Sequence, residues 1–397
     1  MIKKVLTILM LFATGLSFSQ QQILDSANKL IEKRQYLSAY QLLNEADPGN
    51  SIPGVAIAKT SLVLEYYVRS VMHVSFALAD LEPDQQLNEL RSSEGNFDLF
   101  IFSPDTVLNN LIEIYPENYE LHKSLGNFYH DVHLKYGSNW IIPDSMLVVR
   151  FMKNYGEAFE NEVYDARSLY GLGYAFLLYQ QYQQSIKFFV MSIELDPENP
   201  SAYYNLAYAF LYNNEKEKAI ASALKAMELY QYAPYAAESA RIAAVAYAEM
   251  DRPKKALEFY RKANEIYPDD YYTLRPLLAM EVQLGDTAFP RRTENFLALS
   301  PANPSIYQDL MHIYWRNGKQ DLLINFLENR KNVYRSDTNV VANLHFFIGK
   351  IQHDKGDSTL SIQNFREARN LFDNVYQQEH DVFKVIDDYL QRLGADK

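Results

Sequence analysis

A repeat of 34 residues constrains the fold of this chain more than any other feature. When the sequence is aligned on itself at that spacing, large apolar residues recur three or four positions apart around one small residue. A second small residue follows about twelve positions later, and proline closes the copy. The clearest copy is residues 166–199, which carries Leu169, Leu172, Gly173, Phe176, Ser185, Phe189, Ser192 and Pro197. Spacings of three and four residues are helical spacings.

Further copies fill the second half of the chain. Residues 200–233 and 237–270 repeat the pattern closely, 304–337 and 342–375 more weakly, and 270–303 form a degenerate copy. The pattern resembles the tetratricopeptide repeat (TPR), whose signature combines W-x2-L-G-x2-Y, A-x3-F and a final proline. This resemblance implies an all-α fold, a right-handed TPR superhelical solenoid of antiparallel helix pairs in which each unit packs on its neighbours.

Small residues mark where two helix backbones should approach closely. They stand at the eighth place of three copies, as Gly173, Ala207 and Ala244, and again at the start of the second helix. Polar pairs are expected to form the turns inside the helix pairs, at Tyr182-Gln183, Asn213-Asn214, Asp251-Arg252 and Gly318-Lys319. Asp196-Pro197 and Tyr267-Pro268 are expected to stop the second helix. The 31 tyrosines and 22 phenylalanines are then explained mainly as core filling between pairs.

The N-terminal half follows the repeat less closely. Residues 20–50 read as one helix pair, and 51–164 as a divergent helical region with insertions. Within it, the apolar, partly alternating runs between 70 and 104 could form short strands or an extended flap, and 136–143 interrupt a helix pair. At the other end, 376–397 are expected to supply the capping helix that a repeat array needs.

Residues 1–19 have the pattern of a secretory signal peptide. Lys3 and Lys4 precede the apolar stretch 5–16, and Ser17-Phe18-Ser19 fits the small-x-small cleavage pattern. No later segment offers the run of about 18 apolar residues that a transmembrane helix needs, and a lipid anchor would require a cysteine. We therefore expect an exported protein, periplasmic or secreted, with no transmembrane segment and no lipid anchor.

Composition excludes several function classes. The net charge is -12 and basic residues occur at most in pairs, which argues against nucleic acid as a partner. Because the chain has no cysteine, thiol nucleophiles, disulfides and cysteine-ligated metals are excluded. Phosphate-binding loops and hydrolase motifs are absent from the sequence, so no cofactor and no enzyme activity are expected; an active site would have to lie in residues 51–164. The best metal candidate is His130 with His133, with Asp131 and His122 on the same predicted helix. A third ligand at a known spacing is missing, so no metal site is predicted.

The TPR resemblance places binding residues on a concave surface built from the first helix of each pair. Its second, fifth, ninth, twelfth and thirteenth places give a groove lined by tyrosines. We predict as partner-binding residues Arg167, Tyr170, Tyr174, Tyr204, Tyr208, Tyr212 and Arg241. Tyrosines suit extended peptides or sugar rings, although several could instead pack against neighbouring helices.

One TPR subtype holds C-terminal carboxylates with a clamp of lysine, asparagine and arginine. Lys123 and Asn127 match its first repeat, but Gly171, Ser201 and Asn205 stand where the remaining groups belong, so the clamp is incomplete. The sequence therefore favours an exported scaffold that binds a protein or peptide of the cell envelope. The alternatives are a glycan-binding protein of the envelope and, further off, an enzyme with its site in 51–164.

Overall fold

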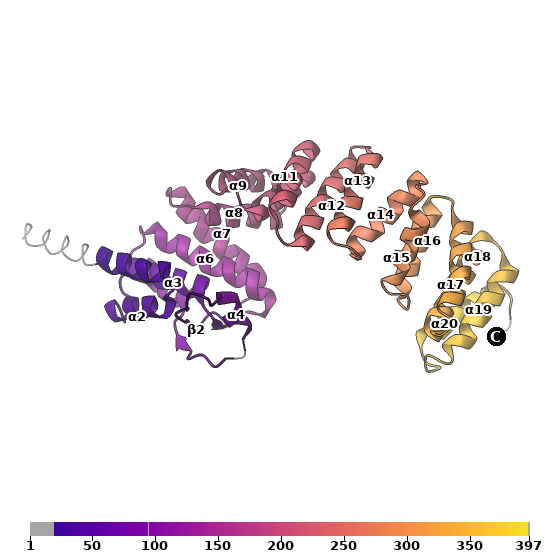
Figure 1. Ribbon diagram of the computed structural model, residues 1–397, viewed down its shortest axis with the longest axis horizontal. Coiled ribbons are helices and arrows are strands. Elements are labelled where there is room, and N and C mark those ends of the chain that lie inside the picture. The colour runs from indigo at the N-terminus through magenta and orange to yellow at the C-terminus, as the bar shows by residue number, and fades with distance from the viewer. Residues whose placement is uncertain (1–19, 94, 396–397) are drawn as a thin grey trace, which may run out of the picture. The chain divides into compact units, whose positions relative to one another are not determined.

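A computed structural model of the chain describes residues 20–93 and 95–395. Consecutive antiparallel helices make up most of it, in adjacent pairs as in TPR solenoids (Figure 1). The predicted all-α, helix-pair class is confirmed. The predicted export signal, residues 1–19, lies outside the described residues. Across the described part of the chain, no helix is both long and apolar enough to cross a membrane.

The chain divides into two units, with the boundary between Asn213 and Asn214. In the first unit, residues 20–32 are helical. The elements that follow are α2 (Tyr36–Ala46), α3 (Pro53–Tyr66), β1 (Arg69–Val71), β2 (Ser75–Ala77), α4 (Leu87–Ser92), β3 (Phe100–Ile101), α5 (Pro104–Ile114), α6 (Tyr119–Tyr136), the 3-10 helix η1 (Gly137–Asn139), α7 (Asp144–Glu160), α8 (Ala166–Leu178), α9 (Tyr182–Leu195) and α10 (Pro200–Tyr212).

The second unit is helical in all its described elements. These are α11 (Lys216–Leu229), α12 (Ala233–Glu249), α13 (Pro253–Ile266), α14 (Tyr271–Leu284), α15 (Phe289–Ala298), α16 (Pro304–Arg316), α17 (Gln320–Val333), α18 (Thr338–Lys355), α19 (Ser358–Phe372) and α20 (Asp381–Arg392). The last helix buries Phe383, Ile386 and Leu390 against α19 and α18 and leaves Val385 exposed.

Small residues lie where the two helices of a pair touch, as the repeat pattern predicts. A Cβ atom at Gly173 of α8 would stand 2.7 Å from Cδ1 of Phe189 on α9, so no larger residue fits without displacement. The Ser185 hydroxyl, also on α9, donates a 2.8 Å hydrogen bond to the Gly173 carbonyl. The last pair repeats this contact, because Ser361 donates to the carbonyl of Gly349 over 2.9 Å. Close backbone approach is therefore a shared feature of the repeats.

Polar residues and prolines set the helix ends. Asn199 caps α10 by accepting a hydrogen bond from the Ser201 amide, with Pro200 in the first helical position, where its missing N–H is not needed. Helices α9 and α13 end at Leu195 and Ile266, just before the predicted stops.

The turns inside the pairs carry one residue with a left-handed backbone. Asp251 and Gly318 have φ of 54° and 64°, and both lie in predicted turns. The predicted turn at Tyr182-Gln183 is wrong, because these residues begin α9. The turn lies two residues earlier, where Gln180 has φ of 58°. A glutamine in that conformation is uncommon, so its propensity gave no signal for the turn.

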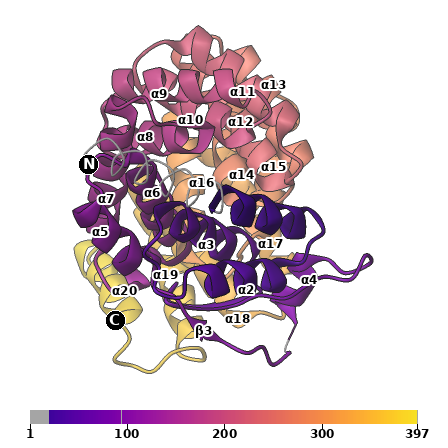
Figure 2. The same ribbon diagram turned by 90° about the vertical axis from the view of Figure 1, so that its left-hand side faces the viewer.

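Of the two alternatives for the divergent region, short strands or an extended flap, the structure has short strands. Strands β1, β2 and β3 form an antiparallel sheet in that order, with Arg69 opposite Ala77 and Ser75 opposite Ile101. Figures 1 and 2 both place the sheet beside α2, α3 and α4. The insertion at 136–143 contains η1, after which the Trp140 indole donates a 2.7 Å hydrogen bond to the Met72 carbonyl between β1 and β2. The insertion thus holds the sheet against the helices.

Candidate functional site

The five predicted tyrosines lie on two adjacent first helices, and we call them the tyrosine face: Tyr170 and Tyr174 on α8, and Tyr204, Tyr208 and Tyr212 on α10. Four-residue spacing keeps each set on one side of its helix. The rings of Tyr170 and Tyr174 stack at 6.3 Å, as do those of Tyr208 and Tyr212. The Asn205 amide on α10 donates to the Tyr170 hydroxyl over 2.9 Å, which joins the two helices.

The tyrosine face combines packing with exposure. Its four inner members are half-buried, whereas Tyr212 is 62% exposed and stacks on Tyr182 at 5.5 Å. Burial, with a smaller contribution from the Asp144 carboxylate, raises the pKa of Tyr174 above its usual value. Each inner tyrosine therefore has one surface against the protein and another toward solvent.

The two predicted arginines lie in different units. Arg167 precedes Tyr170 on α8, and its guanidinium is 3.5 Å from the Asp131 carboxylate. Arg241 lies on α12 of the second unit, where it pairs with Glu238 at 2.9 Å and stands over the Tyr272 ring. It borders a pocket of about 350 Å³ between α12 and α14.

The residues that match part of a carboxylate clamp are engaged within the protein. The Lys123 ammonium is 2.9 Å from Glu120 and 3.5 Å from Asp165. The Asn127 side-chain oxygen accepts a 2.9 Å hydrogen bond from the Tyr155 hydroxyl. These groups are therefore neutralised or paired where a carboxylate ligand would need them free.

The three histidines of the metal candidate have separate partners. His122 bonds to Asn154 at 3.0 Å, and His133 to Asp144 at 2.6 Å. His130 is only 3% exposed, and burial, with the nearby Arg167 and His133, lowers its pKa to about 3. A neutral His130 thus lies in the core beneath Tyr170 and Tyr174, whose ring centroids are 6.0 Å away.

A serine–histidine–aspartate cluster that the sequence does not predict lies in the divergent region. The Ser70 hydroxyl is 2.7 Å from Nδ1 of His73, whose Nε2 is 2.8 Å from the Asp131 carboxylate. Hydrolases arrange these residue types in the same order. No sequence pattern points to this cluster, because His73 lies outside the repeats and Asp131 is 58 residues away.

The contacts of His73 hold it between the sheet and α6. Met72 and His73 both have φ of 52°, a strained backbone for residues other than glycine. His73 is fully buried, and the Tyr136 hydroxyl also approaches its Nδ1, at 3.1 Å. Hydrogen bonds at both ring nitrogens thus fix the turn between β1 and β2 onto α6.

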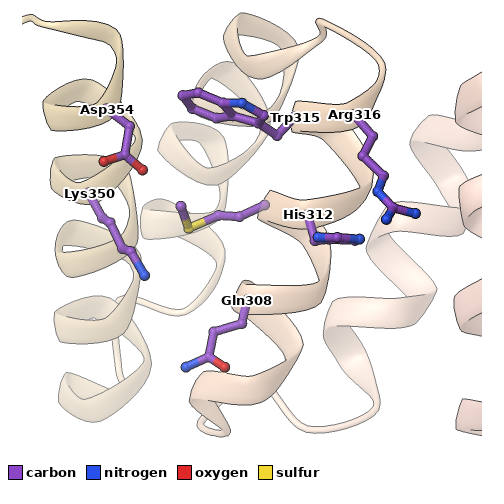
Figure 3. Close-up of a pocket in the computed structure, with 7 residues that line it drawn as sticks. Gln308, His312, Trp315, Arg316, Lys350 and Asp354 are labelled. Carbon is purple, nitrogen blue, oxygen red and sulfur yellow. The ribbon is translucent and has the colours of Figure 1, made fainter.

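A pocket of about 500 Å³ lies in the second unit, between α16 and α18 (Figure 3). We call it the Trp315 pocket. Its lining residues are Gln308, Met311, His312, Trp315, Arg316, Lys350 and Asp354. In copy 304–337, four of them occupy the fifth, ninth, twelfth and thirteenth places, and Lys350 and Asp354 occupy the ninth and thirteenth places of 342–375. The rule that selected the tyrosine face would have found this pocket if it had been applied to the weaker copies.

The comparisons with known proteins agree on the repeat. Residues 188–221 and 242–270 each match a tetratricopeptide repeat family model. No curated protein matches the sequence.

Several solved structures are similar in part. PilF of Pseudomonas aeruginosa has a TM-score of 0.41 and 12% identity over 55% of this chain and 96% of its own. MamA of Desulfovibrio magneticus RS-1 has a TM-score of 0.36 and 19% identity, with coverage of 44% and 92%. YrrB, described as a TPR protein with an unusual peptide-binding site, has a TM-score of 0.35 and 14% identity, with coverage of 47% and 95%.

Proposed function

We propose that this chain is an exported TPR scaffold of the cell envelope that binds an extended segment of a protein partner on the tyrosine face. The helix-pair repeats and the two TPR family matches support a protein-interaction role, because such repeats typically present binding surfaces. The signal-peptide pattern at 1–19 supports export.

The observation that carries the proposal is the exposure of the tyrosine face. Four half-buried tyrosines and the exposed Tyr212 present ring surface along two adjacent helices. Tyrosine gives a large contact area while losing only two side-chain torsions, which makes it effective at protein interfaces. A partner lying across α8 and α10 would cover the outer edges of these rings and could bond to their hydroxyls.

Variants of the tyrosine face test this binding. The partner is first captured by cross-linking and pull-down from envelope extract with the parent protein. Its affinity is then measured for Tyr174→Ala and Tyr208→Ala, with Tyr164→Ala as the control, since Tyr164 is an exposed tyrosine in the loop before α8. Loss of a central contact should weaken binding about thirtyfold, while the control binds normally.

Circular dichroism must show that each variant keeps its helices. Folded tyrosine variants that bind as tightly as the parent would remove the tyrosine face from the proposal. Capture of a polysaccharide in place of a protein would favour the glycan-binding alternative.

Export is tested separately by N-terminal sequencing of the protein from an envelope fraction. We expect Gln20 as the first residue. Recovery of chains that begin at Met1 would contradict export. It would not bear on the proposed binding surface.

A further inference from the structure

We infer that the Trp315 pocket is a second binding site, specific for an acidic peptide segment that carries a carboxylate next to an apolar side chain. The inference rests on the proposed function, because it names the chemistry of a protein partner. It assigns that chemistry to residues outside the tyrosine face.

The pocket is built from side chains that two helices direct toward one space. Figure 3 shows the Trp315 indole reaching from α16 toward α18, and Lys350 and Asp354 projecting from α18 toward α16. Arg316 and His312, which also line the pocket, extend in Figure 3 from the side of α16 that is turned away from α18. A volume of about 500 Å³ lies in the usual range for small-ligand sites and would accommodate a short peptide end.

Two cations of the pocket are left without a counterion. Within the described residues, the side chains of Arg316 and Lys350 make no ion pair or hydrogen bond, although the chain as a whole has a net charge of -12. Several other cations of this unit are paired with acids, as Arg275 is with Asp309 at 2.6 Å and Arg369 with Asp387 at 2.8 Å. Arginine can bind a carboxylate with two parallel hydrogen bonds, which makes Arg316 the principal anion-binding group here.

One carboxylate also borders the pocket. Asp354 is 3.1 Å from Nδ1 of His353, so its carboxylate has a hydrogen-bond partner outside the pocket. With Arg316 and Lys350 opposing this single acid, the lining has a positive balance. A neutral ligand would leave both cations unpaired, whereas an acidic one complements them.

The apolar part of the pocket explains why the ligand needs more than charge. Trp315 is 41% exposed and Met311 lies beside it half-buried. The other tryptophan, Trp140, is 8% exposed and hydrogen-bonded to Met72. Tryptophan and arginine are the residues most often found at binding hot spots, and here they are consecutive in the sequence. An apolar ligand side chain against the indole would place its neighbouring carboxylate near Arg316.

Tryptophan fluorescence can test this site directly. In the full chain carrying Trp140→Phe, Trp315 is the only tryptophan, so its emission reports on the pocket alone. The probe is the acetylated peptide Gly-Ser-Gly-Asp-Glu-Phe with a free C-terminal carboxylate. A saturable change in emission that weakens with added salt is expected. Arg316→Gln and Lys350→Gln should each weaken binding about tenfold, whereas Arg335→Gln, at an exposed arginine outside the pocket, should not.

Two modified peptides identify the source of the carboxylate. An amidated C-terminus removes the terminal charge, and replacement of Asp-Glu by Asn-Gln removes the side-chain charges. Loss of binding with either peptide supports the site and identifies whether the terminal or a side-chain carboxylate binds there. Equal binding of a peptide with both modifications, or parent-like binding by the Arg316 and Lys350 variants, would overturn the inference. Binding of oligogalacturonate with no response to the peptides would overturn it in favour of an acidic glycan.

These results are separable from those on the tyrosine face. If the peptide does not bind while Tyr174→Ala and Tyr208→Ala still weaken partner binding, the scaffold proposal stands and the Trp315 pocket is wrongly assigned. If the peptide binds while the tyrosine variants behave as the parent, the pocket is a site and the tyrosine face is not.

Discussion

The tyrosine face and the Trp315 pocket occupy equivalent places of different repeats, yet their side chains have different environments. At the fifth and ninth places, Tyr170 and Tyr174 are half-buried, and Tyr170 is hydrogen-bonded to Asn205. At the same places of a later copy, Gln308 and His312 are exposed. The repeat therefore determines the position of a surface residue. The type of side chain determines whether it packs against the protein or is exposed to solvent.

The largest expected effect concerns the scaffold that both surfaces share. Gly173→Leu should force α8 and α9 apart, because even a Cβ atom there would lie 2.7 Å from Phe189. Overpacking of this kind destabilises by about 1 to 3 kcal/mol or more. The matched control is Gly156→Leu, since Gly156 lies within α7 and a Cβ there has no atom within 4 Å.

Thermal unfolding of the two glycine variants provides the measurement. The melting temperature should fall by several degrees for Gly173→Leu and stay close to the parent value for Gly156→Leu. If both variants melt as the parent does, the close approach of α8 and α9 is wrong.

The second prediction concerns the buried histidine behind the tyrosine face. His130 has a pKa of about 3 in the folded chain against 6.5 as the ordinary value, so the unfolded chain takes up its proton first. Its contribution to stability is therefore complete above pH 6.5 and is lost as the pH falls toward 3. At pH 5 this loss is about 2 kcal/mol.

His130→Phe keeps a ring in the core and removes this titration. Urea unfolding at pH 7 and pH 5 should show the parent losing about 2 kcal/mol more than the variant. Because the other histidines remain in both proteins, their contributions cancel in the comparison. Equal losses in both proteins would mean that His130 is not buried in its neutral form.

The smallest expected effect is a difference in stability between variants of the tyrosine face and of the Trp315 pocket, measured without ligand. Tyr174→Ala should destabilise the fold by about 1 to 2 kcal/mol, because part of the ring is buried. Trp315→Ala should change stability by less than about 0.5 kcal/mol, because its ring faces solvent and α16 is held by other residues. Chemical denaturation of both variants checks the contrast. Similar losses would show that the Trp315 pocket is also committed to packing.

Much of the helical repeat could be predicted because local sequence determines it. Gly173 opposite Phe189 and the prolines after α9 and α13 are features of single repeats, and the structure places them as predicted. The short strands followed from alternating apolar residues, although their pairing did not. The turn at Gln180 was missed because a glutamine there carries no turn signal.

The candidate sites divide in the same way. Repeat spacing selects the tyrosine face and, when extended to the weaker copies, the residues of the Trp315 pocket. The cluster around His73 could not be predicted, because Asp131 comes to it through tertiary packing across 58 residues. Whether a cation is paired likewise depends on how the helices pack. That Arg316 and Lys350 have no paired acid could not be predicted from the sequence, because it depends on where the neighbouring acids lie in the fold.

In our proposal, the tyrosine face of α8 and α10 binds a protein partner. Site-specific photo-cross-linking in cells tests this most directly, with benzoylphenylalanine placed at Tyr208 on α10 or, as the control, at the exposed Gln184 on α9. We predict a discrete protein adduct from position 208 that position 184 does not give. The absence of any protein adduct at position 208, or the same adducts at both positions, would contradict the account.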